Sequence, residues 1–176
     1  SVPDVDCVTI CVGGETVETK LKADDVLLFN TVTSAEKAQV RLYFPEAGGR
    51  LLGSEYRTIT VDDDNFAERR ILDALLSGPE SGRLTRAFPQ DTIVLSVYTQ
   101  DGVCTVSLSG LAENEAGKSK SDGELAVYSV VNSLTTLAGV RSVQILIDGK
   151  QVPSLWGFDI SRPLTRSESV IGSAAH

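Results

Sequence analysis

Hydrophobic and polar residues alternate in two runs between residues 35 and 61. From Ala35 to Phe44 the residues Val40, Leu42 and Phe44 fall on one face, and Arg41 and Tyr43 on the other. Alternation with a period of two predicts a strand with one buried face. Pro45 and Gly48-Gly49 end this run, and the run from Glu55 to Val61 predicts a second strand.

A helical pattern replaces the alternation at Asn65. Asn65 and Glu68 have the spacing of a capping box, which satisfies the free N–H groups at a helix start. Gly78-Pro79 ends the pattern, since glycine adopts the left-handed cap and proline cannot continue a helix. The apolar stripe of this helix consists of Ala67, Ile71, Leu72, Leu75 and Leu76.

The region from Thr92 to Ser109 predicts a β-hairpin, because two alternating runs flank Asp101-Gly102, the composition that a type I′ turn prefers. A two-residue turn fixes the register of the strands. The expected cross-strand pairs are Thr99 with Cys104, Val97 with Val106, and Leu95 with Leu108. In this register Cys104 is a buried thiol.

A second helix is expected from Ser121, where Ser121 and Glu124 form another capping box, to Gly139. Its apolar stripe comprises Val127, Val130, Val131, Leu134, Leu137 and Ala138. Two strands follow, a buried one at Arg141–Asp148 and a short one at Trp156–Ser161.

This order of elements predicts an α+β fold, a mixed or antiparallel sheet with two helices packed on one face. Residues 1–35 are expected to form an N-terminal arm or hairpin, residues 36–166 the domain, and residues 167–176 a disordered tail. The two cysteines of the arm, Cys7 and Cys11, are too far apart for a disulfide within one strand, so we expect them to be small apolar residues on one strand face. The alternative is a turn between them that would allow a disulfide.

Charge excludes one class of partner. The chain of 176 residues has 24 acidic and 16 basic residues, a formal net charge of −8. Its lysines and arginines are dispersed, so the field repels polyanions and nucleic acid is not an expected partner. The sequence also contains no apolar run of the roughly 20 residues that a membrane-spanning helix needs.

The sequence offers few residues for catalysis or metal binding. The single histidine is the last residue, His176, so neither a Ser-His-Asp nor a Cys-His arrangement can be built. Asp62-Asp63-Asp64 lacks the spacing of a calcium loop and suits the positive end of the following helix dipole. We therefore expect no catalytic residues, no metal site and no cofactor; a hydrolase that uses two of the acidic side chains is the third alternative.

The aromatic residues near the C-terminus are the remaining candidates for a functional surface. Trp156, Phe158 and Asp159 lie on the last expected strand and could mark a partner or ligand surface. The alternative is that Trp156, the only tryptophan, completes the core.

An ordered set of short segments runs from Gln39 to Leu164. The most specific segment is Tyr128-Ser129-Val130-Val131-Asn132-Ser133-Leu134-Thr135. The other segments, in order, are Val40–Pro45, Ile71–Pro79, Leu84–Pro89, Val94–Val97, Asp101-Gly102, Val106–Ser109, Gly139-Val140, Val143–Ile147, Gly149 and Asp159–Leu164. With this set the chain resembles the GerM family of sporulation and germination proteins, although Phe88 and Trp156-Gly157-Phe158 depart from the family pattern.

The resemblance implies an α-β-β-α-β core of the ring-building type and a non-enzymatic structural or interaction module of the spore or cell envelope. It implies an extracytoplasmic location, an anchor upstream of Ser1 on the outer face of the cytoplasmic membrane, and partners among other envelope or sporulation proteins, self-association included. The alternative function is a domain that binds a small ligand or a cell-wall glycan. Exposure of Trp156, Tyr128 and Tyr98 would favour that alternative.

Overall fold

A computed structural model describes residues 10–12, 15–17, 36–61, 66–112 and 116–172. The chain divides into two compact units, Ser1–Ser34 and Ala35–His176. In the first unit, β1 (Ile10–Val12) pairs antiparallel with β2 (Glu15–Val17). Cys7, Asp62–Asp64 and His176 lie outside the described residues, so both alternatives for Cys7 and Cys11, unbridged apolar residues or a disulfide, stay open.

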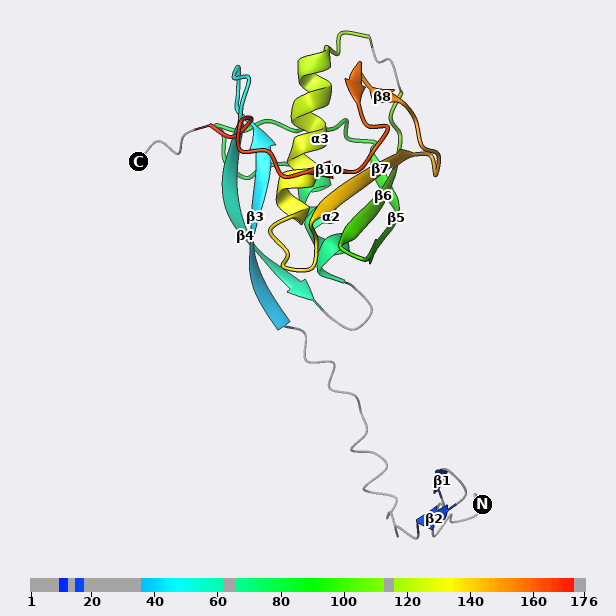
Figure 1. Cartoon of the computed structure of the whole chain (residues 1–176). Helices are drawn as coiled ribbons and strands as arrows, with labels where there is room; N and C mark the ends of the chain where they lie inside the picture. The colour runs from blue at the N-terminus through cyan, green and yellow to red at the C-terminus, as the bar shows by residue number, and fades with distance from the viewer. Residues whose placement is uncertain (1–9, 13–14, 18–35, 62–65, 113–115, 173–176) are drawn as a thin grey trace, which may run out of the picture. The chain divides into compact units, whose positions relative to one another are not determined.

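The two predicted alternating strands form a long antiparallel ribbon (Figure 1). It consists of β3 (Glu36–Pro45) and β4 (Leu52–Val61), with Arg41 opposite Tyr56. The face with Val40, Leu42 and Phe44 is buried, as predicted. Tyr43 on the opposite face is only 1% exposed, because a second cluster formed with Leu52, Leu125 and Val170 covers it.

The remaining strands form a mixed sheet in the order β10-β7-β6-β5. β5 (Ile93–Gln100) and β6 (Val103–Ser109) are antiparallel, and β7 (Ser142–Ile147) lies parallel to β6. The short β10 (Leu164–Thr165) pairs antiparallel with β7 and leaves β5 at the opposite edge.

Two helices, α2 (Ala67–Ser77) and α3 (Lys120–Leu134), lie between the β3–β4 ribbon and the four-stranded sheet (Figure 1). One core joins Leu42 and Phe44 of the ribbon, the apolar sides of both helices, and the inward residues of the sheet. The α+β class with two helices is thus confirmed, and α2, β5, β6, α3 and β7 follow the predicted α-β-β-α-β order.

The β5–β6 hairpin confirms part of the predicted register and corrects the rest. Asp101 and Gly102 both have positive φ, 52° and 82°, as a type I′ turn requires. Thr99 pairs with Cys104 and Val97 with Val106, as predicted. The pair of Leu95 with Leu108 is wrong, because a bulge between Val94 and Ser96 shifts the register, so that Leu108 faces Val94.

Both helices start differently from the prediction, and α3 also ends differently. At α2 the N-cap residue is Phe66, whose side chain makes no capping hydrogen bond, and Asn65 lies outside the described residues. At α3 the capping box is formed by Ser119 and Asp122 instead of Ser121 and Glu124. The helix ends at Leu134, before the expected Gly139, because the hydroxyls of Thr135 and Thr136 bond carbonyls of its last turn.

The expected strand at Trp156–Ser161 is instead a tight hairpin of β8 (Ser154–Leu155) and β9 (Phe158–Asp159). Trp156 and Gly157, both at positive φ, form the turn between them. Gly78 does end α2, as expected, with φ of 91°.

Part of the predicted tail is folded. The backbone N–H of Leu52 donates to Val170, and that of Gly172 donates to Leu52, at 2.7 and 2.8 Å. Asn132 of α3 is fully buried and binds the backbone of Ser167 with both its amide nitrogen and its amide oxygen. Residues 167–172 therefore belong to the domain; residues 173–176 lie outside the part that is described.

Candidate functional site

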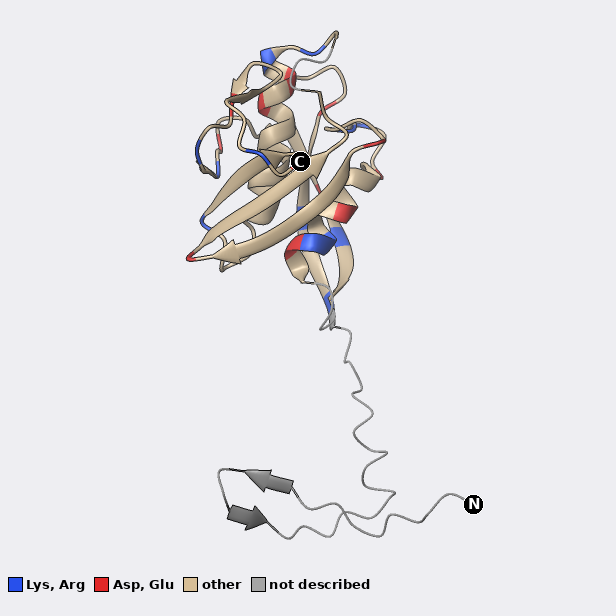
Figure 2. Cartoon of the chain, turned by 90° about the vertical axis from the view of Figure 1, so that its right-hand side faces the viewer, with Lys and Arg blue, Asp and Glu red and all other residues tan. Residues whose placement is uncertain are grey.

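The three long strands of the four-stranded sheet carry no charged residue. There is no Asp, Glu, Lys or Arg in Ile93–Gln100, Val103–Ser109 or Ser142–Ile147. In the whole chain, 40 residues, or 23%, are charged. The helices cover only the inner face of this sheet. Figure 2 shows the outer face of the sheet, where no charged residue interrupts these strands before the end of the β5–β6 hairpin.

Large apolar side chains are exposed at the β5 edge of this face. Ile93 is 56% exposed, Leu95 48% and Tyr98 56%. The bulge explains the exposure of Leu95, because it inserts one residue into β5 and turns this side chain away from the core. We call the exposed Ile93, Leu95 and Tyr98 the β5 face.

A small apolar groove of about 240 Å³ runs beside the β5 face, between β5 and the start of α2. Phe66, which is 69% exposed, lines it together with Val97 and Tyr98, and Glu68 and Thr99 complete the lining. Edge strands of monomeric proteins are commonly protected by charged residues or proline. β5 contains neither, although the side chain of Arg69 in α2 does bind the carbonyl of Val94.

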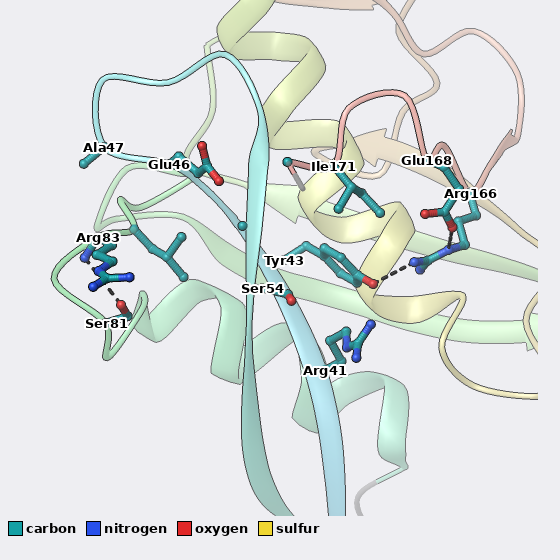
Figure 3. A pocket seen from close by; sticks show the side chains of 13 residues that line it. Arg41, Tyr43, Glu46, Ala47, Ser54, Ser81, Arg83, Arg166, Glu168 and Ile171 are labelled. Carbon is teal, nitrogen blue, oxygen red and sulfur yellow. Dashed lines mark hydrogen bonds and ion pairs between the residues drawn. The ribbon is translucent and has the colours of Figure 1, made fainter. Parts of the chain in front are cut away.

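The outer face of the β3–β4 ribbon is hollowed around Tyr43 (Figure 3). A hollow of about 650 Å³ is lined by Arg41, Arg83 and Arg166 and by the acidic Glu46 and Glu168. A second hollow of about 480 Å³ shares Arg41, Tyr43 and Arg166 with it and extends to the end of α3.

Tyr43 holds this region together through its backbone as well as its side chain. Its N–H donates to Ser133 Oγ at 2.9 Å, and its carbonyl accepts from Ser129 Oγ. These two serines are one helical turn apart on α3, so the helix covers the β3 edge that β4 leaves unpaired. Neither serine was predicted to act in this way.

Arg41 and Arg166 both lie beside Tyr43, whose hydroxyl points towards Arg166 (Figure 3). Its Nη2 donates to the Tyr43 hydroxyl at 2.6 Å, its Nη1 to the Asn132 carbonyl at 3.1 Å, and its Nε pairs with Glu168. Burial alone lowers the pKa of Arg166, but the hydrogen bonds to Tyr43 and Glu168 outweigh it and raise the pKa above its ordinary value. The guanidinium is therefore held rigidly and stays charged.

The aromatic candidates near the C-terminus have mixed exposure. Trp156 is 4% exposed, donates its indole N–H to the Ala112 carbonyl at 3.0 Å and lies under Lys118. Phe158 is half-buried and makes an edge contact with Tyr128. The burial of Trp156 supports its alternative role in the core.

Asp159 is exposed, and its carboxylate accepts from the hydroxyl and the backbone N–H of Ser161. These bonds hold the pKa of Asp159 below its ordinary value. The structure thus brings Trp156, Phe158 and Asp159 to one hairpin, and the side chain of Asp159 caps the turn that follows it.

The described residues contain no group of three or more His, Cys, Asp or Glu side chains that could bind a metal. Cys104 is fully buried and unbridged, as predicted, and burial raises the pKa of its thiol. In the same part of the chain, no helix is long and apolar enough to cross a membrane.

Comparison with known families and structures gives consistent results. Residues 41–153 match the sequence model of the Germane family, described as sporulation and spore germination. No curated protein matches the chain closely enough to serve as a relative.

Three solved structures have a similar fold. A protein of Clostridium perfringens described as a lipoprotein is 27% identical, with a TM-score of 0.51, over 73% of this chain and 87% of that one. The tandem GerMN domains of GerM from Bacillus subtilis are 18% identical, with a TM-score of 0.59, over 96% of this chain and 60% of theirs. The first GerMN domain alone is 20% identical, with a TM-score of 0.56, over 75% of this chain and 98% of that domain.

Proposed function

The chain belongs to the Germane family of sporulation and spore germination domains, and from this premise we propose that it is a non-enzymatic assembly module of the bacterial spore or cell envelope. The matched segment includes both helices and the three long strands. The observation that carries the proposal is the β5 face, where Ile93, Leu95 and Tyr98 are exposed on an edge strand that has no charged residue.

The chemistry of this surface suits a protein partner. Exposed apolar side chains on a surface that lacks charge are a common feature of the centre of protein interfaces, where charged groups are depleted. An edge strand also offers unpaired backbone groups to a partner strand. A ligand that carries charge would find no counter-charge on these strands.

Another copy of the chain is one suitable partner. At a net charge of −8, two copies repel each other, and an uncharged face lets them approach without opposing carboxylates. The similarity to a protein with two GerMN domains in tandem supports domains of this kind working side by side. A ring-type assembly is the form of association that we propose.

An extracytoplasmic location agrees with the relatives, one of which is described as a lipoprotein. We propose that the domain is anchored to the outer face of the cytoplasmic membrane by a segment outside residues 1–176. Interfaces smaller than roughly 1,200 Å² are usually transient, so association would depend on the high local concentration that an anchor provides.

Site-specific photo-cross-linking in cells tests the proposal. A photoreactive phenylalanine analogue replaces Leu95 or Tyr98 in the full-length protein, and the control position is Leu51, a 37% exposed leucine just before β4. We expect discrete adducts from positions 95 and 98 and none from position 51. A dimer-sized adduct identifies a second copy, and a larger one identifies an envelope partner by mass spectrometry. Absence of adducts at both positions of the β5 face would contradict the proposal.

A further inference from the structure

The smaller hollow beside Tyr43 is separate from the β5 face, and its charge is positive whereas the net charge of the chain is negative. It has a volume of about 480 Å³ and lies between the outer face of the β3–β4 ribbon and the end of α3. Its charged lining residues are two arginines, Arg41 and Arg166, and none of its lining residues is acidic. In a chain of net charge −8, this concentrates positive charge at one place.

Arg41 has unused hydrogen-bond donors. It lies directly opposite Tyr56, its guanidinium is 4.7 Å from the centre of the Tyr56 ring, and its Nη2 donates to the Tyr56 hydroxyl. Across the described residues, no carboxylate pairs with it. A guanidinium has five N–H donors, so four stay available to a ligand.

Arg166 contributes a second, immobilised guanidinium. Three of its N–H groups bind Tyr43, Asn132 and Glu168, and the group also lies 5.0 Å from the centre of the Tyr43 ring. Two donors remain. Because Arg166 is fixed by these contacts before any ligand arrives, binding to it costs little side-chain entropy.

The hydroxyl groups of the hollow favour the same kind of ligand. The phenolic oxygens of Tyr43 and Tyr56 accept from the arginines, which leaves their own O–H groups to donate to an anion. The hydroxyls of Thr135 and Thr136 donate to helix carbonyls, so towards a ligand they can only accept. The hollow thus presents donors suited to an oxyanion and acceptors suited to a hydroxyl group.

We propose that this hollow binds an oxyanion, phosphate or carboxylate, carried on a small hydroxylated molecule, with Arg41 and Arg166 as its main ligands. Guanidinium groups bind both oxyanions with paired N–H···O bonds. The volume falls within the range of small-molecule sites. The site shares no residue with the β5 face and does not rest on the proposed function.

Titrations followed by ¹H–¹⁵N NMR test this inference on the whole chain. The probes are glycerol 3-phosphate, inorganic phosphate and glucuronate, with glycerol as the neutral control. We expect saturable shifts at Arg41, Tyr56, Thr135 and Arg166 with the hydroxylated anions, weakened by salt because the contact is ionic. If glycerol 3-phosphate binds more tightly than glucuronate, the site prefers phosphate; the reverse order shows that it prefers carboxylate.

Two variants make the result specific. Arg41→Gln removes an exposed guanidinium that the fold does not need, and it should weaken binding roughly tenfold or more, the value of charge-assisted hydrogen bonds. Arg83→Gln, at an exposed arginine of the larger hollow only, should leave the affinity unchanged. No saturable shifts with any anion, equal binding of glycerol, or unchanged affinity in Arg41→Gln would overturn the inference.

Discussion

Leu108 of β6 faces Val94 of β5 across the hairpin, one residue away from Leu95. Leu108 is fully buried and Val94 is 7% exposed, whereas Leu95 is 48% exposed. A single bulge therefore divides three neighbouring apolar residues between the core and the outer face of the sheet. The core keeps its packing, and the outer face gains an apolar side chain that the alternation pattern assigned to the interior.

This division predicts unequal effects of substitution on stability. Leu95→Ser should change the free energy of unfolding by less than about 1 kcal/mol, since Leu95 is already 48% exposed and lies outside the core. Leu108→Ala should lower it by about 2–5 kcal/mol, because it leaves a cavity in the core. Urea unfolding of both variants measures the difference. Comparable losses from the two substitutions would show that Leu95 is a core residue and that the bulge is absent.

A second prediction concerns the edge of β3, where Ser133 accepts from the Tyr43 N–H inside the fold. Ser133→Ala leaves this buried N–H without an acceptor, so it should cost about 1–3 kcal/mol of stability. Ser121→Ala is the matched control, because Ser121 is an exposed serine of the same helix. Denaturant unfolding of both variants provides the measurement. Equal stability of the two would mean that water or another group satisfies Tyr43.

The capping box of α3 predicts a dependence on pH. Ser119 donates to the Asp122 carboxylate through its hydroxyl and its backbone N–H, and these bonds lower the pKa of Asp122. A lowered pKa in the folded state stabilises the fold above the unfolded pKa of about 3.9, and this stability is lost as the pH falls through the folded pKa. Because Asp122 is an exposed residue, we expect a small effect.

Comparison of Ser119→Ala with the natural chain isolates this effect. At neutral pH the variant should lose about 0.5–2 kcal/mol, the usual cost of removing an N-cap residue. Below pH 4 the difference between the two proteins should shrink, because protonation of Asp122 weakens the box in the natural chain as well. Thermal unfolding from pH 7 to pH 3 follows the difference. A stability difference that stays constant across this range would show that protonation of Asp122 does not weaken the cap.

The accuracy of the sequence interpretation depended on how local each signal was. Asp101-Gly102 determines its turn through its own backbone preferences, and the alternation from Val40 to Phe44 marks the buried face directly, so both predictions are confirmed. The bulge at Leu95 leaves no mark in the alternation, since an inserted apolar residue looks like one more core position. The positive φ of Trp156 is equally hidden, because non-glycine residues rarely adopt it.

The hollow beside Tyr43 could not be predicted for a different reason. Arg41 and Arg166 are 125 positions apart in the sequence, and neither belongs to a recognisable motif. They meet because Asn132 binds the backbone of Ser167 and so brings the C-terminal segment to the end of α3. Asn132 lies outside the predicted apolar stripe of its helix, so the pattern gave no sign that its side chain is buried and binds Ser167.

The last prediction concerns the buried thiol of Cys104. Burial raises the pKa of Cys104, a hydrogen bond with Thr99 lowers it less, and the nearby charge of Glu68 raises it further. A raised pKa in the folded state contributes stability that is present below the unfolded thiol pKa of about 8.5 and is lost as the pH rises beyond it. In a Cys7→Ser, Cys11→Ser background, Cys104 should therefore resist a thiol reagent at pH 9 in the folded state and react fully in urea, as a colorimetric thiol assay would measure. Cys104→Ala should also reduce the fall in stability between pH 8 and pH 10. Rapid labelling of the folded protein would place Cys104 at a solvent-accessible position, in contradiction to its full burial between Thr99 and the core.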